Sequence, residues 1–210
     1  MYKKIILIIM SFLLIGCTSN NINKLTLEEI IDSSLENENS YVNINNKGYK
    51  YNLPDEFIVY EDNDYVQTLM SKNNFYFLNI DVVSYYYKNN MIQERNLKDY
   101  EYYEFGNDDK SGYMRITRND SKFLVELCYN YAIIEVEVEE SELRYAVSRG
   151  ISILNSIEYN DLVIGNYIED NDIENRETVY NIPEPENKDD NENVLEFIEE
   201  FEVENSDDLD

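Results

Sequence analysis

The chain has 210 residues, with 44 acidic and 17 basic side chains, a net charge of −27 and no histidine. This charge argues against nucleic-acid binding, because nucleic-acid-binding proteins use basic clusters to neutralise phosphates. It also argues against a domain that lies flat on an anionic membrane. The lack of histidine removes the commonest general base and the commonest metal ligand.

The first residues have the pattern of a cleaved leader. Lys3 and Lys4 precede an apolar run over residues 5–15. The run is too short to span a bilayer, which requires about 20 apolar residues. It has the length of the hydrophobic region of a signal peptide. Gly16 and Cys17 follow it directly.

The run Leu14-Ile15-Gly16-Cys17 resembles the lipobox of bacterial lipoproteins. The resemblance implies that a signal peptidase cuts between Gly16 and Cys17, and that the Cys17 thiol receives a diacylglyceryl group. The new amino terminus is often acylated as well, for example with palmitate, and two or more chains hold a protein firmly on a membrane. We therefore expect a signal peptide over 1–16, a lipidated tether over 17–25, and anchoring on the extracytoplasmic face of the cell membrane. An ordinary secretory signal and an uncleaved membrane helix are the alternatives.

A single domain is expected over residues 26–165. Thr26 and Glu29 form a capping box at the start of a helix predicted over 26–38. From residue 41 to residue 139, apolar side chains mostly alternate with polar ones, which is typical of an antiparallel sheet. Strands are predicted at 49–53, 57–60, 78–87, 100–105, 113–117, 123–127 and 134–138, with the 100–105 strand at an edge. Residues 65–70 fit either a helical turn or another strand.

An amphipathic helix is predicted over 141–155, with Ser141 as its N-cap. We expect this helix to cover the sheet face that carries Ile134, Val136 and Val138. Residues 157–159 are expected to lead out of the domain. The predicted fold class is α+β: an antiparallel sheet of about five or six strands, a C-terminal helix packed on one face and a short N-terminal helix.

The C-terminal segment over 166–210 carries 18 acidic and 2 basic residues. Such a composition predicts an acidic, mostly disordered tail. Helical spacing of the apolar residues within it predicts a short helix at 193–202, formed around Val194, Leu195, Ile198 and Phe201. This helix could bind a partner's groove, dock on its own domain or remain unfolded.

Tyrosine is abundant in the predicted sheet, at Tyr85, Tyr86, Tyr87, Tyr100, Tyr102, Tyr103, Tyr129 and Tyr131. These rings could form a surface that recognises a glycan, a peptide or another partner. Tyrosine is also a good strand former, and a purely structural role is the favoured interpretation. Cys128 lies in an apolar strand, where we expect a buried, inert thiol.

No cofactor or specific metal site is expected. Asn107, Asp109, Ser111 and Gly112 match the first positions of a calcium-binding loop, but Arg118 stands where such a loop requires a bidentate glutamate. Weak, diffuse binding of divalent cations to the acidic tail is the only metal interaction that the sequence favours.

Two short motifs carry a second resemblance, over about residues 41–160. The run Tyr51-Asn52-Leu53-Pro54, with Phe57 soon after it, precedes the predicted strands, and Ile153-Leu154-Asn155-Ser156-Ile157 closes the last helix. This arrangement resembles the small PsbP-like α+β domains of many bacterial lipoproteins, and small lipoproteins of low-GC Firmicutes and their wall-less relatives. The resemblance implies a fold and a role as a binding or assembly module.

The expected function is that of a non-enzymatic, membrane-anchored extracytoplasmic lipoprotein that binds a protein or another component of the cell envelope. No catalytic residue is singled out. A carboxylate-dependent envelope hydrolase is one alternative, and it requires two carboxylates about 5–10 Å apart in a cleft. A solute-binding receptor is the other, although the chain is small for the usual two-lobed receptor.

Cys17→Ala tests the lipid anchor. Cells that express the unchanged protein and are fed a palmitate analogue should label it, whereas the variant should lose the label because it lacks the acylated thiol. Labelling is read from the immunoprecipitated protein, and Cys128→Ala serves as the matched control that keeps its label. Unchanged labelling of Cys17→Ala would contradict the lipobox interpretation.

Overall fold

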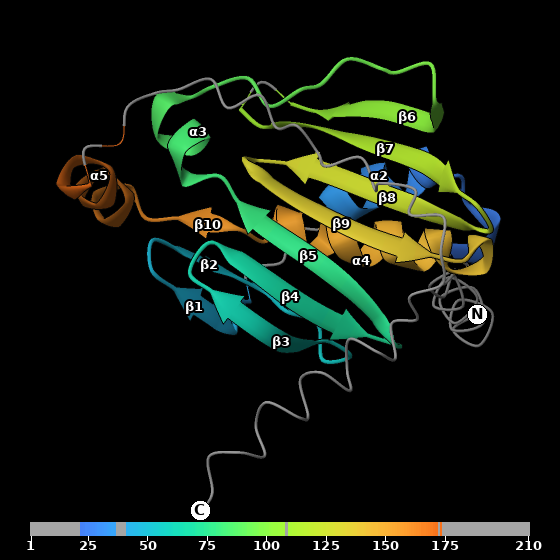
Figure 1. Cartoon of the computed structure of the whole chain (residues 1–210), viewed down its shortest axis with the longest axis horizontal. Coiled ribbons are helices and arrows are strands. Elements are labelled where there is room, and N and C mark those ends of the chain that lie inside the picture. Colours follow the sequence, from blue (N-terminus) through green and yellow to red (C-terminus); the bar gives the residue numbers. More distant parts are fainter. Residues whose placement is uncertain (1–21, 37–40, 108, 172, 174–210) are drawn as a thin grey trace, which may run out of the picture. The chain divides into compact units, whose positions relative to one another are not determined.

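The computed structural model describes residues 22–36, 41–107, 109–171 and 173 (Figure 1). These residues form an α+β fold with a seven-stranded antiparallel sheet, a three-stranded sheet and several helices. The predicted fold class is confirmed, and the main sheet has more strands than the five or six predicted. No helix in the described part of the chain is long and apolar enough to cross a membrane. The predicted lipobox and the segment 193–202 lie outside the described residues.

The main sheet has the strand order β3-β4-β5-β9-β8-β7-β6, and every neighbouring pair is antiparallel. The 100–105 segment forms an edge strand, as predicted. The strands are β3 (Ile58–Asn63), β4 (Val66–Ser71), β5 (Asn74–Ile80), β6 (Asp99–Gly106), β7 (Ser111–Asn119), β8 (Lys122–Tyr129) and β9 (Ala132–Val138).

The hairpin of β4 and β5 shows which of the two predicted alternatives, a helical turn or a strand, residues 65–70 adopt. Ser71 pairs with Asn74, so the turn between the strands consists of Lys72 and Asn73 alone. Both turn residues have positive φ angles, of 52° and 68°. This geometry is that of a type I′ turn, whose twist matches the twist of paired strands. Residues 66–71 are therefore a strand.

The smaller sheet joins β1 (Ile44–Asn46), β2 (Tyr49–Tyr51) and β10 (Glu158–Tyr159). Two tyrosine hydroxyls connect β2 to the main sheet. Tyr51 donates a hydrogen bond of 2.8 Å to the buried side-chain oxygen of Gln67. Tyr49 donates one of 2.8 Å to the carbonyl of Asp64.

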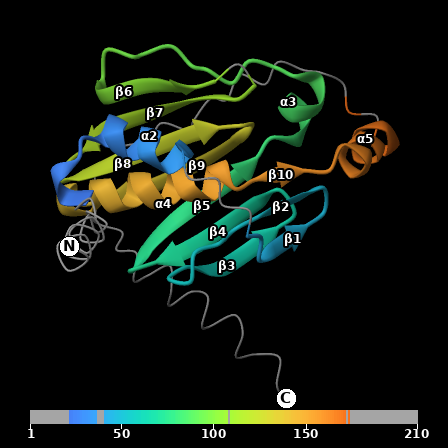
Figure 2. The same ribbon diagram turned by 180° about the vertical axis from the view of Figure 1, so that it is seen from behind.

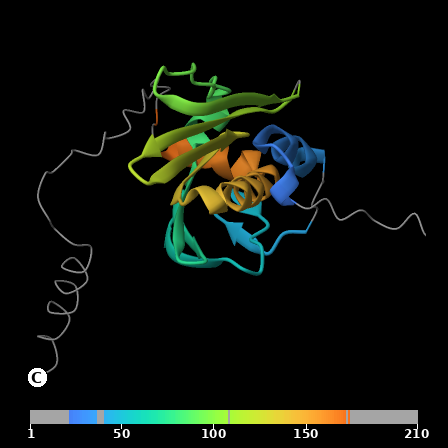
Figure 3. The same cartoon turned by 90° about the vertical axis from the view of Figure 1, so that its right-hand side faces the viewer.

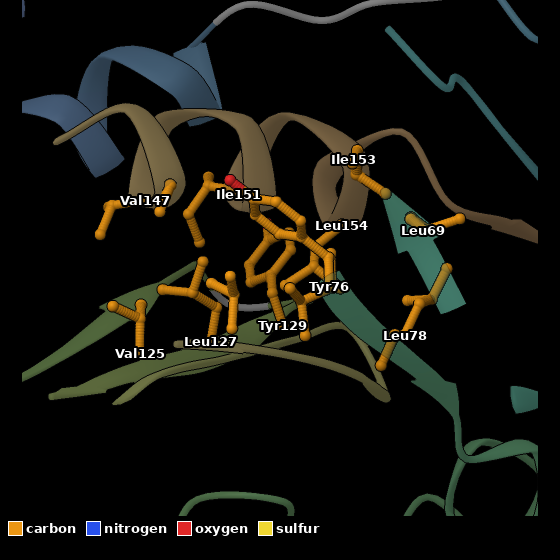
Figure 4. Packing of buried hydrophobic residues seen from close by; sticks show 14 of the residues in the cluster. Leu69, Tyr76, Leu78, Val125, Leu127, Tyr129, Val147, Ile151, Ile153 and Leu154 are labelled. Carbon is orange, nitrogen blue, oxygen red and sulfur yellow. The ribbon is translucent and has the colours of Figure 1, made fainter. Parts of the chain in front are cut away.

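Helix α4 (Leu143–Asn155) packs across one face of the main sheet, hereafter the inner face, and α2 (Leu27–Glu36) packs beside it (Figure 2). The sheet curves around α4 (Figure 3). Side chains of α4 such as Val147 and Ile151 point toward Val125 and Leu127 on β8 (Figure 4). Ile134, Val136 and Val138 are also buried on this face. The predicted cover of the sheet by this helix is confirmed.

Gly150 permits the close approach of α4 to the sheet. A Cβ atom at this position would stand 2.4 Å from the Cδ1 atom of Leu127 and 3.7 Å from a methyl carbon of Ile134. Both neighbours are fully buried, so the space next to the helix is already filled. A larger residue would have to displace part of the core.

The two predicted N-caps have opposite outcomes. The capping box at α2 is confirmed: the Thr26 amide donates to the Glu29 carboxylate at 2.9 Å, and the Glu29 amide donates to the Thr26 hydroxyl at 3.2 Å. The prediction that Ser141 caps α4 is wrong. A turn of 3₁₀-helix, η2 (Glu140–Glu142), precedes α4 and includes Ser141, and Glu142 takes the N-cap position without a side-chain hydrogen bond.

The predicted continuation of a strand through residues 82–87 is also wrong. Strand β5 ends at Ile80, and residues Val82–Tyr87 form helix α3. The carboxylate of Asp81 accepts a hydrogen bond of 2.8 Å from the Ser84 amide and so caps the helix. Lys88 ends the helix in the left-handed conformation, with a φ angle of 57°. A local capping interaction thus overrides the strand-forming composition of Val82–Tyr87.

Residues 158–171 are part of the fold rather than leading out of it. Strand β10 pairs with β2, and helix α5 (Asp161–Asp170) follows. The Asn160 side chain caps α5 by accepting a hydrogen bond from the Val163 amide at 3.2 Å. The change of composition at residue 166 therefore falls inside a helix.

Gly150→Val should lower the free energy of unfolding by about 1–3 kcal/mol, because its side chain would overpack the contact with Leu127. Gly165→Val is the matched control in a second helix. A Cβ atom at Gly165 would meet only a Tyr86 ring carbon, at an ordinary 3.6 Å. This control should change the free energy by less than about 0.5 kcal/mol. Urea unfolding measures both variants, and equal effects would contradict the packing argument.

Candidate functional site

The face of the main sheet opposite α4, hereafter the outer face, is turned toward the viewer in Figure 1, with β9 and β5 in front of α4. Side chains alternate between the two faces of a strand. On β5, Tyr76 and Leu78 are fully buried on the inner face. Phe75 precedes Tyr76 and is 42% exposed, and Phe77 lies between Tyr76 and Leu78 and is 51% exposed. The strand therefore presents two phenylalanine rings to solvent.

These rings belong to a larger exposed cluster, the aromatic patch. Phe77 lies opposite Thr68, and Phe75 lies opposite Met70, which in turn faces Ile58. The rings of Tyr60 and Phe75 meet edge to face, with centroids 5.3 Å apart. We define the aromatic patch by its five large exposed side chains: Ile58, Tyr60, Val66, Phe75 and Phe77.

A register shift in β3 adds a carboxylate to the patch. The pairing of β3 with β4 shifts between Val59 and Glu61, so that Glu61 faces Thr68. The Thr68 hydroxyl donates a hydrogen bond of 3.4 Å to the Glu61 carboxylate. Such a bulge places an extra residue in one strand and re-aims its side chains. Tyr60 and Glu61 are consequently both exposed beside the phenylalanine rings.

Acidic side chains continue along the outer face beyond the rings. Glu135 on β9 lies opposite Phe77, and on its other side it faces Glu126 of β8. Burial, together with the nearby Glu126 carboxylate, raises the pKa of Glu135. The sequences of β3, β4, β5 and β9 contain no lysine or arginine. The aromatic patch thus stands in an acidic setting.

Arg115 and Lys122 supply positive charge on the other half of the outer face. Lys122 pairs with Glu137 at 3.3 Å, and the contacts of Arg115 are internal. Its guanidinium lies 3.2 Å from the Glu126 carboxylate and 3.5 Å from that of Asp99. It also donates to the Gln93 side chain at 2.8 Å and to the Glu94 carbonyl at 3.0 Å. Residues 93–94 therefore cover this part of the sheet. Arg115 holds that segment in place and does not neutralise the patch.

The tyrosines singled out from the sequence do not form one surface. Tyr129 is buried in the core, and Tyr103 stacks on Phe105 with centroids 5.9 Å apart. Tyr85 stacks on Tyr159 at 4.0 Å and lies beneath the ammonium group of Lys88. Tyr102 donates a hydrogen bond to the Gln93 carbonyl. These four tyrosines pack or form hydrogen bonds within the fold, whereas Tyr86, Tyr87 and Tyr100 are exposed.

Sequence reasoning missed the aromatic patch. The signal was present in Asn74-Phe75-Tyr76-Phe77-Leu78, where aromatic residues occupy both phases of a strand. One phase, with Tyr76 and Leu78, fills the core. The other phase must then carry Phe75 and Phe77 to the opposite face.

An open groove of about 610 Å³ lies elsewhere, lined by residues 45–50 and 158–163. It contains two carboxylates, the feature that the hydrolase alternative requires. Glu158 pairs with Lys50 at 2.7 Å, and Asp161 accepts a hydrogen bond of 2.5 Å from the Tyr85 hydroxyl. Desolvation and this bond to Asp161 raise the pKa of Tyr85 to about 12. Both carboxylates therefore hold neighbouring elements together.

The calcium-like spacing near residue 107 has a local structural role. The Asn107 side-chain oxygen accepts hydrogen bonds from the amides of Asp109 and Lys110, both at 2.9 Å. These bonds shape the turn before β7. Among the residues that the structure describes, no three His, Cys, Asp or Glu side chains are grouped to hold a metal ion. Cys128 is fully buried, as predicted, and this burial raises the pKa of its thiol.

Comparison with protein-family models, with curated proteins and with solved structures finds no match for this chain. The resemblances to bacterial lipoproteins and to PsbP-like domains therefore stay predictions.

Glu135→Gln tests the acidic setting of the patch. A raised pKa means that the folded protein holds the Glu135 proton more tightly than the unfolded chain. The stability that this gives is present below the ordinary pKa of 4.5 and is lost as the pH rises through the raised pKa. At pH 7, removing this half-buried charge should raise the free energy of unfolding by about 0.2–1 kcal/mol.

The gain from Glu135→Gln should shrink toward zero below pH 4.5, as measured by urea unfolding across the pH range. Glu137→Gln is the control on the same strand. It removes an ion pair of 3.3 Å with Lys122 and should not stabilise the protein. An equal gain for Glu135→Gln at pH 4 and pH 7 would contradict the electrostatic explanation.

Proposed function

We propose that this protein is a lipid-anchored, extracytoplasmic binding module that holds a protein of the cell envelope against its aromatic patch. The observation that carries the proposal is the exposure of five large apolar side chains side by side on one sheet face. Contiguous exposed apolar patches on soluble domains often mark interaction sites. Aromatic side chains also dominate the energetics of protein interfaces.

The acidic setting of the patch favours a protein over a lipid surface as its partner. Glu61, Glu135 and Glu137 lie on the same face as the rings, and the four strands concerned carry no lysine or arginine. Lys122 of the neighbouring strand β8 pairs with Glu137, which leaves Glu61 and Glu135 as the acids of the patch. Anionic headgroups would repel these carboxylates. A patch that inserted into a membrane would instead be expected to carry basic residues around its apolar centre.

The proposed location of the protein is inferred from its first residues. Acylation at Cys17 would place the domain outside the cytoplasm and on the membrane, where envelope proteins are within reach. The chain needs no buried catalytic group for such a role, because binding depends on the shape and chemistry of the exposed face.

A photo-activatable amino acid at position 68 tests the proposal in intact cells. Thr68 lies between Glu61 and Phe77 on the outer face, so a bound partner would contact it. Irradiation should give a discrete adduct with an envelope protein. The additional change Phe75→Ser with Phe77→Ser should reduce this adduct at least tenfold, because it removes two rings of the patch.

The matched control is Leu97→Ser with Leu162→Ser, which removes two exposed apolar side chains away from the patch. This control should leave the adduct unchanged. Equal loss of the adduct in both double variants, or the absence of any adduct at position 68, would contradict the proposed binding role.

A further inference from the structure

The edge strand β3, which borders the aromatic patch, indicates what kind of partner segment could bind there. Strand β3 ends the order of the seven-stranded sheet and, among the described residues, has β4 as its only hydrogen-bonded neighbour. An edge strand leaves a row of backbone N–H and C=O groups available for pairing. Five of the six residues of β3 are exposed. The opposite edge strand, β6, is mostly half-buried.

The charge of this edge is uniformly negative. Glu61 and Asp62 are exposed within β3, and exposed Asp64 follows in the turn to β4. The nearest lysine along the chain from β4, Lys72, has its ammonium group 3.5 Å from the centre of the Tyr145 ring, which belongs to helix α4. Arg149 of the same helix pairs with Glu56 at 2.7 Å. Among the residues that the structure describes, the acids of this edge therefore have no matching cation.

This charge decides between two possible occupants of the edge. A second copy of the chain would bring another row of carboxylates against Glu61 and Asp62, and like charges on facing strands repel. The side chains of Glu61 and Asp62 point to opposite faces of the sheet, because Glu61 lies opposite Thr68 and Asp62 lies opposite the buried Gln67. A cationic strand could place its basic side chains next to Asp62 and its alternate, apolar side chains next to Ile58 and Tyr60 on the outer face. The charge of Glu61 would add to the attraction along this edge.

We propose that the partner contributes an extended cationic segment, with basic and apolar side chains in alternation, which pairs with β3 as an additional strand and extends the aromatic patch beside Ile58 and Tyr60. This inference rests on the proposed function and names the partner's chemistry. The mode is β-strand addition, in which backbone hydrogen bonds give affinity and alternate side chains give specificity.

The test uses the full-length lipidated protein in phosphatidylcholine nanodiscs and a fluorescent ten-residue peptide of alternating lysine and valine. Fluorescence anisotropy at low salt measures binding. The alternating Lys-Val peptide should bind, and a Glu-Val peptide of the same length should bind at least tenfold more weakly. Adding salt should weaken the binding of the Lys-Val peptide, because salt screens the attraction between exposed charges.

Protein variants separate the edge from the overall charge. The double variant Glu61→Lys with Asp62→Lys should bind the Lys-Val peptide at least tenfold more weakly than the unchanged protein. Glu169→Lys with Asp170→Lys makes the same change of net charge at two exposed positions of α5 and should weaken binding less than twofold. All four positions are exposed, so thermal unfolding should show both variants folded. Equal weakening by the two variants would overturn the proposal.

Methylation of alternate peptide nitrogens separates strand addition from simple charge attraction. A Lys-Val peptide methylated on every second nitrogen keeps its charge but loses backbone donors on one edge. Of the two possible methylated peptides, at least one should bind at least tenfold more weakly than the unmodified peptide. Unchanged binding by both would overturn strand addition.

The outcome at position 68 distinguishes this inference from the proposed function. If the cross-linked adduct depends on Phe75 and Phe77 while the Lys-Val peptide fails to bind, the cationic strand is wrong and the binding role stands. If the adduct itself fails to depend on the rings, the binding role is wrong, and this inference falls with it.

Discussion

Close contact between α4 and β8 determines which face of the seven-stranded sheet is buried. Gly150 lets the helix backbone approach Leu127, and the curved sheet surrounds the helix with apolar side chains. Because successive side chains of a strand point to opposite faces, burying one face of the sheet forces the intervening residues of each strand onto the other face. Phe75 and Phe77 must face outward because Tyr76 and Leu78 fill the space beneath α4. The aromatic patch is thus a consequence of the same packing that stabilises the domain.

An exposed aromatic surface next to an unpaired sheet edge is ordinarily a risk of aggregation. In the described part of the chain β3 is such an edge, and its acidic side chains counter that risk. Glu61 and Asp62 on β3 would face their own counterparts in a second copy, and the net charge of −27 repels copies at longer range. The same carboxylates remain able to attract a cationic segment. Negative charge therefore protects the edge from the protein itself while leaving it open to a partner of opposite charge.

The parts of the fold with a clear period were predictable from the sequence. Residues 132–138 and 143–154 gave a strand and a helix because their apolar residues recur every two and every three to four positions. The prediction of a strand at residues 82–87 is wrong. Their composition favours a strand, but the Asp81 carboxylate accepts a hydrogen bond from the Ser84 amide and so starts a helix. Strand β10 has two residues, and its existence depends on the distant β2, which no local pattern reveals.

If Cys17 carries a lipid as predicted, the beginning of the described domain limits how far the domain can stand from the membrane. Ile22 and Leu25 pack against the core, and Arg144 donates a hydrogen bond of 2.9 Å to the Leu25 carbonyl. Part of the tether expected over 17–25 is therefore fixed to the fold. If Cys17 carries the lipid, the five residue steps from Cys17 to Ile22 span at most about 17 Å. A partner that reaches β3 and the aromatic patch must then act close to the membrane, within the range that this short connection allows.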